Sequence, residues 1–308
     1  MGKYALLVLP AANRVYAESS ADLGVAELET LLRVGASVES IAGIRYITFA
    51  ADGVDLERVA QLSVTYALFV RADDEALRPV ALPRVNVYDE DLLTIPRYTG
   101  KTNEHFTKLL VNLTLPSGAT TLLDPMAGRG TTLNQAVMYG LNAIGVEIDK
   151  KDCDAYKVFF TTWLKNKRLP HRAKTDKARF SVEFASDRAA LDGGRGQTAA
   201  MINGDSREVG RLLKKHSVDA IVADLPYNVR HREPSPQQIV EESLAAWRAV
   251  LRPSGRVGVA FNTKVTPRAE LVAVFETAGF TVSNDERFCH RVDQAITRDL
   301  VVATARGA

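Results

Sequence analysis

The first 72 residues alternate between short apolar runs, which predict strands, and stretches with apolar residues at helical spacing, which predict helices. The predicted order is a strand at 4–9, a helix at 23–34, strands at 37–41 and 44–49, a helix at 56–62 and a strand at 64–70. This βαββαβ order is typical of a ferredoxin-like domain, a common fold that implies no function by itself. We therefore expect residues 1–72 to form a small α+β domain that carries no catalytic group.

The pattern changes twice beyond residue 72. Residues 73–98 lose periodicity and contain Pro79, Pro83 and Pro96, which predicts a linker. From 99 to 308 strands and helices alternate, which predicts a doubly wound, mostly parallel sheet. The expected strands are 122–124, 142–149, 199–206, 218–223, 256–261, 280–282 and 295–303, and the expected helices are 107–113, 133–139, 152–165, 239–250 and 268–278. The segment from 165 to 198 is expected to be a loop-rich insertion.

Composition and charge narrow the class of protein. The chain has 308 residues, 46% hydrophobic and 25% charged, as in soluble globular proteins. A net charge of +2 means that any surface for nucleic acid must be local. No apolar run approaches the ~20 residues of a membrane helix, and Cys153 and Cys289 have neither disulfide nor metal spacing. We expect a cytoplasmic protein without a membrane span or a bound metal.

A glycine-rich motif follows the first strand of the second domain. It reads Asp124-Pro125-Met126-Ala127-Gly128-Arg129-Gly130-Thr131-Thr132. A strand, a glycine turn and a helix N-terminus form the cradle of a nucleotide cofactor, because glycine lets a ligand approach the backbone closely. Glu147, followed by Ile148, ends the next strand 23 positions after Asp124, near the ~20-residue offset of an acid that binds ribose hydroxyls.

The same features narrow the cofactor. The motif is Asp-Pro-x-x-Gly-x-Gly, which offers a pyrophosphate fewer glycine N–H groups than Gly-x-Gly-x-x-Gly, and a Gly-Lys-Ser/Thr phosphate loop is absent from the sequence. Glu147, Asp205 and Asp224 each end a predicted strand, where ligands bind in such sheets. Acids in these places suit a ligand with a ribose, an adenine amino group and a positive centre. S-adenosylmethionine has all three.

The sequence Asp224-Leu225-Pro226-Tyr227 supplies a use for that cofactor. The exocyclic amino group of a base is a weak nucleophile, because its lone pair is delocalised into the ring. The carboxylate of Asp224 and a backbone carbonyl of residue 225 or 226 can accept its two hydrogens and hold the nitrogen in line with a methyl group. Pro226 stiffens the turn, and Tyr227 can stack on a base taken out of its helix.

A basic stretch runs from Lys165 to Arg179 and includes Lys167, Arg168 and Arg172. Such a run can be a solvated loop, or it can contact phosphates beside a cofactor site. Both interpretations stay open. His231, shortly after the Asp224 motif, is a candidate for substrate contact.

Residues 101 to about 305 resemble the S-adenosylmethionine-dependent amino (N-) methyltransferases, which carry an Asp/Asn-Pro-Pro-Tyr/Phe motif. The cofactor motif precedes the catalytic motif and a ferredoxin-like module precedes both. In this arrangement the chain is most similar to the THUMP-linked tRNA guanine-N2 methyltransferases, among the RNA methylases. Leu225 stands where that family has its first proline. The resemblance implies a Rossmann-like class I methyltransferase domain at 99–308, preceded by an RNA-presenting domain.

The resemblance also implies roles for single residues. The glycine motif would hold the methionine part of the cofactor, Glu147 the ribose and Asp205 the adenine amino group. The cofactor-binding residues are then Thr102, Asn103, Asp124, Met126, Ala127, Gly128, Gly130, Thr131, Thr132, Glu147, Ile148, Asp205 and Ser206. The catalytic residues are Asp224, Pro226 and Tyr227, and the candidates for substrate contact are Leu225, His231, Lys167, Arg168 and Arg172.

Three functions follow from these features. The first is methylation of RNA, of a tRNA at guanine N2. The second is methylation of adenine N6 or cytosine N4 in DNA, against which the lack of a long target-recognition region after residue 227 weighs. The third, of another class, is an RNA-binding subunit without activity. Carbon-5 methylation is disfavoured, because it needs a cysteine nucleophile and both cysteines lie away from the predicted site.

Overall fold

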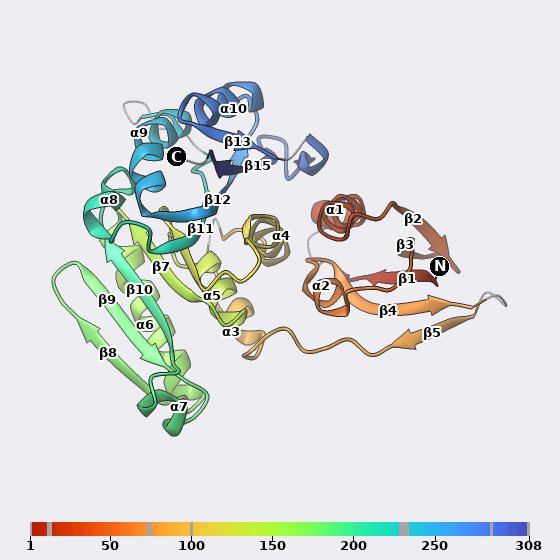
Figure 1. Cartoon of the computed structure of the whole chain (residues 1–308), viewed down its shortest axis with the longest axis horizontal. Coiled ribbons are helices and arrows are strands. Elements are labelled where there is room, and N and C mark those ends of the chain that lie inside the picture. The colour runs from red at the N-terminus through yellow and green to blue at the C-terminus, as the bar shows by residue number, and fades with distance from the viewer. Residues whose placement is uncertain are drawn as a thin grey trace. The chain divides into compact units, whose positions relative to one another are not determined.

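The computed structural model of the chain describes residues 2–10, 14–72, 76–98, 101–227, 234–283 and 286–306 (Figure 1). Its contacts separate two compact units, residues 1–85 with 285–300 and residues 86–284 with 301–308. Each unit has its own hydrophobic core. Within the described residues, no helix combines the length and the apolar character needed to cross a membrane.

The first unit contains a five-stranded sheet of antiparallel pairs in the order β2-β3-β1-β4-β5. Leu6, Ile47 and Leu68 are cross-strand neighbours that pack in one core with residues of both helices, which include Leu28 and Val59. The βαββαβ order is present, so the expected ferredoxin-like domain is confirmed. Its elements are β1 (Gly2–Val8), α1 (Arg14–Leu32), β2 (Ala36–Ile41), β3 (Ile44–Ala51), α2 (Leu56–Gln61), β4 (Thr65–Arg71), β5 (Leu77–Val80), the 3-10 helix η2 (Glu286–Phe288) and β14 (His290–Arg291).

The second unit is built on a sheet whose order, apart from β14, is β13-β15-β12-β11-β6-β7-β10-β9-β8. The five strands from β12 to β10 are parallel, as in the Rossmann-like fold expected from the sequence, which is confirmed. Its strands are β6 (Thr121–Asp124), β7 (Asn142–Glu147), β8 (His171–Thr175), β9 (Arg179–Phe184), β10 (Gln197–Asn203), β11 (Val218–Asp224), β12 (Leu251–Asn262), β13 (Phe280–Val282) and β15 (Thr297–Ala305), which begins in the first unit. Its helices are α3 (Asp91–Thr94), α4 (Glu104–Thr114), α5 (Thr131–Met138), α6 (Lys150–Asn166), α7 (Arg188–Asp192), η1 (Ser206–Glu208), α8 (Val209–Leu212), α9 (Pro236–Val250) and α10 (Arg268–Thr277).

The strand order reverses between β6 and β11. From β6 the chain adds β7 and β10 on one side, and then returns to add β11 and β12 on the other. The helices that follow β6 and β11 therefore diverge, which leaves a crevice at the carboxyl ends of these strands. Asp124 is the last residue of β6 and Asp224 the last residue of β11. The fold thus brings the two predicted motifs to one crevice.

Local sequence explains why the elements beside this crevice begin where they do. Asn103 caps α4, since its Oδ1 accepts hydrogen bonds from the N–H groups of His105 and Phe106. Ser235 and Gln238 form a reciprocal capping box at the start of α9, with Pro236 at the first helical position. In β11 the continuous apolar run from residue 220 to 223 is fully buried, as expected for a central parallel strand.

Two segments contain more regular structure than the sequence indicated. The segment 165–198, expected to be a loop-rich insertion, contains the antiparallel hairpin β8–β9 and the short helix α7, so that expectation is wrong. The missed signal is the alternation of Phe180, Val182 and Phe184 with polar residues, which buries one face of β9. The segment 73–98, expected as a linker, contains β5 and α3.

Candidate active site

The glycine turn after β6 depends on backbone conformations that favour glycine. Gly128 and Gly130 have φ angles of 51° and 82°, in the left-handed region where a Cβ is unfavourable. A Cβ on Gly130 would also lie 2.3 Å from the ring of Tyr156, which is fully buried. A Cβ on Gly128 would meet no atom within 4 Å. The turn is therefore packed against the protein on one side and open on the other.

Asp124 is a buried carboxylate at the start of this turn. Only 2% of the residue is exposed, and its Oδ1 accepts a hydrogen bond of 2.9 Å from the N–H of Met126. Burial raises the pKa of Asp124 to about 7, and the negative charges of Asp224 and Glu147 add to this shift, whereas hydrogen bonds from Met126 and Thr132 oppose it. The crevice therefore carries an excess of negative charge that a cationic ligand would neutralise.

Glu147, at the end of β7, is fixed by backbone donors. Its Oε2 accepts the N–H of Gly128 and its Oε1 the N–H of Asp149, both at 2.8 Å. Each carboxylate oxygen keeps a further lone pair for a ligand hydroxyl. The next residue, Ile148, is 70% exposed. An acid beside an exposed apolar side chain can bind a ribose and one face of a purine.

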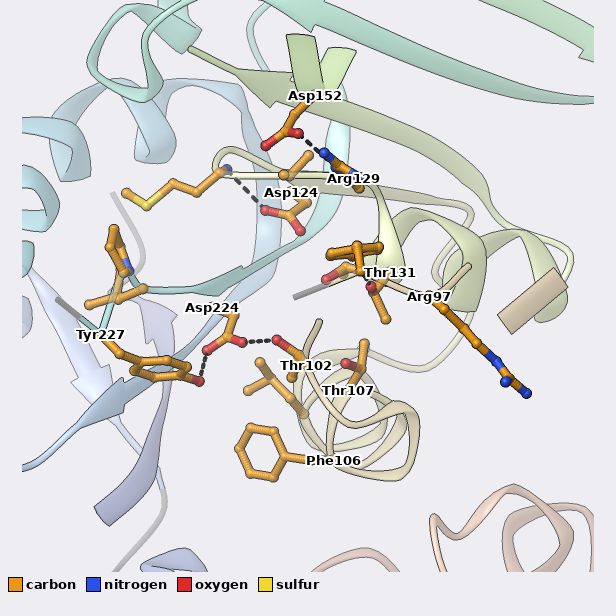
Figure 2. Close-up of a pocket in the computed structure, with 18 residues that line it drawn as sticks. Arg97, Thr102, Phe106, Thr107, Asp124, Arg129, Thr131, Asp152, Asp224 and Tyr227 are labelled. Atoms are coloured by element: carbon orange, nitrogen blue, oxygen red, sulfur yellow. Dashed lines mark hydrogen bonds and ion pairs between the residues drawn. The ribbon is translucent and has the colours of Figure 1, made fainter. Parts of the chain in front are cut away.

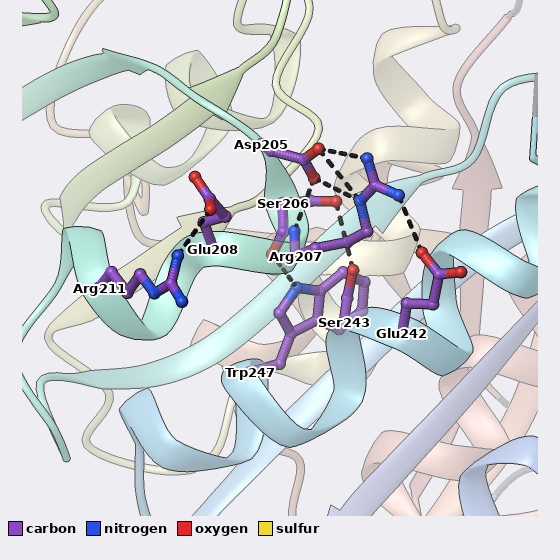
Figure 3. Close-up of polar contacts among 8 residues, drawn as sticks. All are labelled: Asp205, Ser206, Arg207, Glu208, Arg211, Glu242, Ser243 and Trp247. Atoms are coloured by element: carbon purple, nitrogen blue, oxygen red, sulfur yellow. Dashed lines mark hydrogen bonds and ion pairs between the residues drawn. The ribbon is translucent and has the colours of Figure 1, made fainter.

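Asp205, which follows β10, forms a charged pair with Arg207 (Figure 3). The guanidinium donates to both carboxylate oxygens at 2.6–3.0 Å, and this contact lowers the pKa of Asp205. Arg207 also reaches Glu242 of α9 at 2.9 Å. Ser206 is buried, and its hydroxyl pairs with that of Ser243, also on α9. The loop that carries Asp205 is thereby tied to α9.

The Asp224 motif leaves β11 at the other side of the crevice. Leu225 is 1% exposed and belongs to the hydrophobic core, and its N–H donates to the carbonyl of Ala260. Pro226 is exposed and Tyr227 is half-buried. The hydroxyl of Tyr227 donates to Oδ1 of Asp224. Leu225, which stands where the resembling family has its first proline, thus anchors the motif by packing in the hydrophobic core.

The three residues directly before α4, 101–103, connect the start of this helix to the site. Lys101 donates to the carbonyl of Leu93 at 2.6 Å and pairs with Glu104 at 2.5 Å. Thr102 donates its hydroxyl hydrogen to Oδ2 of Asp224, and Asn103 caps α4. Figure 2 shows the carboxylate of Asp224 between Thr102 and Tyr227. Both oxygens of Asp224 are therefore oriented by hydroxyl groups.

Two cavities at the carboxyl edge receive most of the predicted residues. The first, of about 700 Å³, is lined by Thr102, Asp124, Met126, Ala127, Gly128, Thr131, Thr132, Asp224, Leu225, Pro226 and Tyr227 among others. The second, of about 440 Å³, is lined among others by Met126, Glu147, Ile148, Asp205, Ser206, Asp224 and Pro226. Because Met126, Asp224 and Pro226 line both, the cavities adjoin. Asn103 and Gly130 shape the site without being among the lining residues.

Sequence reasoning missed a polar group at the rim of the first cavity. The Tyr98 hydroxyl lies 2.9 Å from the hydroxyl of Thr131, and the guanidinium of Arg129 lies 5.1 Å from the centre of the Tyr98 ring. Arg129 also pairs with Asp152 at 2.8 Å. Other lining residues outside the prediction include Arg97, Phe106, Thr107 and Leu110 in the first cavity and Gly204, Arg207 and Ile239 in the second. The position of Arg129 between Gly128 and Gly130 was the sequence signal that could have predicted this group.

The predicted basic contacts do not line either cavity. Lys167 pairs with Asp89 and Asp91 at 2.8 and 2.7 Å, and Arg172 pairs with Asp192 at 2.5 Å. Arg168 is exposed at the end of α6. His231 lies outside the described residues. In the part of the chain that the structure describes, no group of three or more His, Cys, Asp or Glu side chains is placed to hold a metal ion.

The fold and the crevice define a Rossmann-like methyltransferase. Residues 97–291 match the model of a family described as RMKL-like, methyltransferase domain, and the chain belongs to this family. The protein is therefore an enzyme, and the resemblance to methyltransferases in its motifs is confirmed. A search of curated proteins finds no match.

Solved structures with a similar fold include several methyltransferases. TrmN from Thermus thermophilus is 14% identical, with a TM-score of 0.49, over 99% of this chain and 100% of its own. A 1,6-didemethyltoxoflavin-N1-methyltransferase from Burkholderia thailandensis, solved with S-adenosylhomocysteine, is 16% identical, with a TM-score of 0.39, over 61% and 72%. An rRNA methylase from Streptococcus thermophilus is 13% identical, with a TM-score of 0.40, over 68% and 100%.

The cofactor predicted from the sequence is S-adenosylmethionine, and membership of a methyltransferase family confirms it. The residues present fit this group in charge and shape. Its ammonium and sulfonium are cations, which suit the acidic crevice around Asp124. Its ribose and purine suit Glu147 with the exposed Ile148. The open side of the turn at Gly128 leaves room for its amino-acid part.

The raised pKa of Asp124 predicts a pH dependence of stability in the cofactor-free chain. Since its folded pKa of about 7 lies above the ordinary value of 3.8, the folded state between these two pH values holds a proton that the unfolded state has lost. The free energy of unfolding of the wild type, relative to Asp124→Asn, should therefore fall as pH rises from 4 to 7, by up to about 1.4 kcal/mol per pH unit. Urea unfolding across this range measures the difference.

Asp205→Asn is the matched control. Arg207 lowers the pKa of Asp205, so the dependence of its stability contribution on pH has the opposite sign. The stability that Asp205 contributes is present above its unfolded pKa and is lost as pH falls below about 4. A difference between the wild type and Asp124→Asn that stays flat from pH 4 to 7 would contradict the assignment of Asp124 as a carboxyl group whose ionisation is suppressed by burial.

Proposed function

We propose that the protein is an RNA N-methyltransferase that transfers a methyl group from S-adenosylmethionine to guanine N2 of a tRNA. The observation that carries this proposal is the carboxylate of Asp224, which lies in the crevice that the glycine turn also lines. It is held by Thr102 on one oxygen and by Tyr227 on the other. A carboxylate fixed in this way is an acceptor for the hydrogens of an exocyclic amino group.

The proposed catalytic role of Asp224 is to position the amino group and to take up its proton. When bound, the cofactor supplies a methyl group on a positively charged sulfur. Each oxygen of Asp224 keeps a lone pair beyond the one used by Thr102 or Tyr227, and it can accept an N–H of the base. This orients the nitrogen lone pair toward the methyl group. Because the methylated nitrogen must lose one proton, Oδ1 of Asp224 is the proposed acceptor.

The cysteines support attack by nitrogen rather than covalent catalysis by sulfur. Burial raises the pKa of the Cys153 thiol to about 11, and the thiol donates to the carbonyl of Glu147 at 3.5 Å. Cys289 belongs to the first unit. Carbon-5 methylation needs a thiolate at the base, and neither cysteine lines the two cavities.

Several parts of the proposal rest on the resemblance of the motifs. They are the choice of RNA over DNA, tRNA as the RNA, guanine N2 as the position and residues 1–72 as an RNA-presenting domain. The roles of Glu147 toward the ribose and of Asp205 toward the adenine are likewise proposed, and the cavity that both residues line supports them. The proposed compartment is the cytoplasm, and the free thiols of Cys153 and Cys289 fit a reducing compartment.

Replacing Asp224 by Ala should abolish transfer and leave cofactor binding intact. The turnover number should fall by a factor on the order of 10³, because both the positioning acceptor and the proton acceptor are lost. The dissociation constant of S-adenosylhomocysteine, measured by calorimetry, should change only a few-fold. Asp154→Ala, which removes an exposed acid of α6, is the control. Normal turnover in Asp224→Ala would show that the acceptor site lies elsewhere.

The substrate is tested by nucleoside mass spectrometry. Purified protein is incubated with S-adenosylmethionine and with tRNA, rRNA or DNA from a strain that lacks the gene, and the digests are analysed for new methylated nucleosides. We expect N2-methylguanosine in the tRNA. A mark in DNA alone, on adenine N6 or cytosine N4, would refute the RNA proposal and leave the methyltransferase assignment standing.

A further inference from the structure

The tip of the β8–β9 hairpin lies at the same edge of the sheet as the crevice. Strand β9 runs antiparallel to β10, and Arg179 at its start pairs with Ile202 near the carboxyl end of β10. The N–H of Asn203 donates to the carbonyl of Ala178 in the tip at 2.7 Å. The side chain of Asn203 donates in turn to the carbonyls of Glu147 and Ile148. The tip is thereby fixed beside the second cavity.

Three cations of this tip are available to a ligand. Lys174, Lys177 and Arg179 are exposed, and their side chains form no ion pair or hydrogen bond with any residue that the structure describes. Asp176, the acid among them, accepts the N–H groups of Ala178 and Arg179 and so closes the turn. A cluster of three cations and one acid leaves the tip positively charged.

The charge of the hairpin is polarised along its length. At the opposite end, Arg172 is paired with Asp192 and with Glu183, at 2.5 and 3.6 Å. Lys174 faces Ser181 across the hairpin and lies on the same face as Arg172 and Glu183, because side chains alternate along a strand. Among the described residues, the three hairpin cations near the crevice have no ion-pair partner, whereas Arg172 at the far end of the hairpin is neutralised.

The other face of the hairpin is fixed in the core. Phe180, Val182 and Phe184 are buried, and the Phe184 ring lies edge-on to the Phe160 ring of α6, with 5.4 Å between centroids. Figure 1 shows the hairpin beside α6. The basic tip is therefore carried on a packed, regular element, which fixes the backbone positions of its three cations before RNA binds.

We propose that Lys174, Lys177 and Arg179 contact the phosphate backbone of the RNA substrate outside the nucleotide that is methylated. This proposal rests on the proposed function, and it moves the phosphate contact from Lys167 and Arg172, which are engaged in ion pairs, to the opposite end of the hairpin. The positive charge of the tip suits the regularly spaced phosphates of a nucleic acid, and the proposed function makes that nucleic acid RNA.

The distance from the crevice determines what the contact does. Strand β8 is separated from β11, which ends at Asp224, by five strand-to-strand steps, roughly 24 Å at about 4.8 Å per step. The tip therefore meets RNA several nucleotides from the base at Asp224. The contact holds the substrate and is remote from the reacting atoms. Its loss should raise the KM for a folded RNA and leave turnover at saturation unchanged.

The test is a charge-removing triple variant, Lys174→Gln, Lys177→Gln and Arg179→Gln. The control is Arg188→Gln, Lys214→Gln and Lys215→Gln, which removes the same charge from exposed residues at the amino edge of the sheet. Affinity for bulk tRNA and for a DNA duplex is measured between 50 and 300 mM salt. Methyl transfer is measured on tRNA and on a short single-stranded RNA that carries the target base.

We expect the hairpin variant to bind tRNA on the order of 100-fold more weakly at 0.1 M salt, because each lost contact lowers the slope of log K against log salt by ~0.7–0.9. Its KM for tRNA should rise while kcat stays within two-fold, and transfer to the short RNA should match the wild type. The control variant should retain the wild-type slope.

Two outcomes would overturn the proposal. One is a hairpin variant with wild-type tRNA affinity and salt slope, particularly if it self-associates, since lysines on an edge strand also block pairing between sheets. The other is a loss that affects the DNA duplex and leaves tRNA unchanged. Failure of the proposed function gives a different result, in which the wild type itself transfers no methyl group to RNA.

Discussion

The reversal of strand order between β6 and β11 is the constraint on which the rest of the site depends. The helices that follow these two neighbouring parallel strands diverge and leave a crevice. Each of the two strands ends in an aspartate at this crevice. Asp124 is buried there with its pKa raised, partly by the charge of Asp224. Burial is the largest cause of this shift and the charge of Asp224 adds to it, so a ligand with positive charge would stabilise the ionised carboxylate of Asp124. Burial of the Asp124 carboxylate destabilises the protein without its ligand, and the same burial favours a cationic methyl donor.

Contacts between segments that are distant in sequence complete the site. Thr102, which is 122 positions from Asp224, orients its carboxylate, and Asn203 joins the turn at Glu147 to the tip of the β8–β9 hairpin. Arg207 connects Asp205 to α9. The side of the crevice with Glu147 and Asp205 and the side with Asp224 are therefore supported by separate sets of hydrogen bonds. Lining residues such as Met126 are shared by both cavities and connect them.

Patterns that are local in sequence were the ones that could be predicted. The apolar runs of β6, β7 and β11 are continuous because both faces of these strands are buried, and each ends in an acid that marks the ligand edge. The β8–β9 hairpin was not predicted, because β8 is an exposed edge strand and only β9 alternates between apolar and polar residues. The ion pairs of the basic residues also could not be predicted from a local pattern. Lys167 pairs with Asp89, which lies 78 positions earlier in the sequence. Ion pairing of this kind is decided by tertiary packing.

One crevice at the carboxyl ends of β6, β7, β10 and β11 is proposed to hold the methyl donor and to present it to Asp224. The most direct measurement is a crystal structure of the protein with S-adenosylhomocysteine bound. The account predicts ligand density that spans both cavities past Met126, with the amino-acid end at Asp124 and the ribose at Glu147. Density at any other place on the chain, or ribose hydroxyls that contact no oxygen of Glu147, would contradict it.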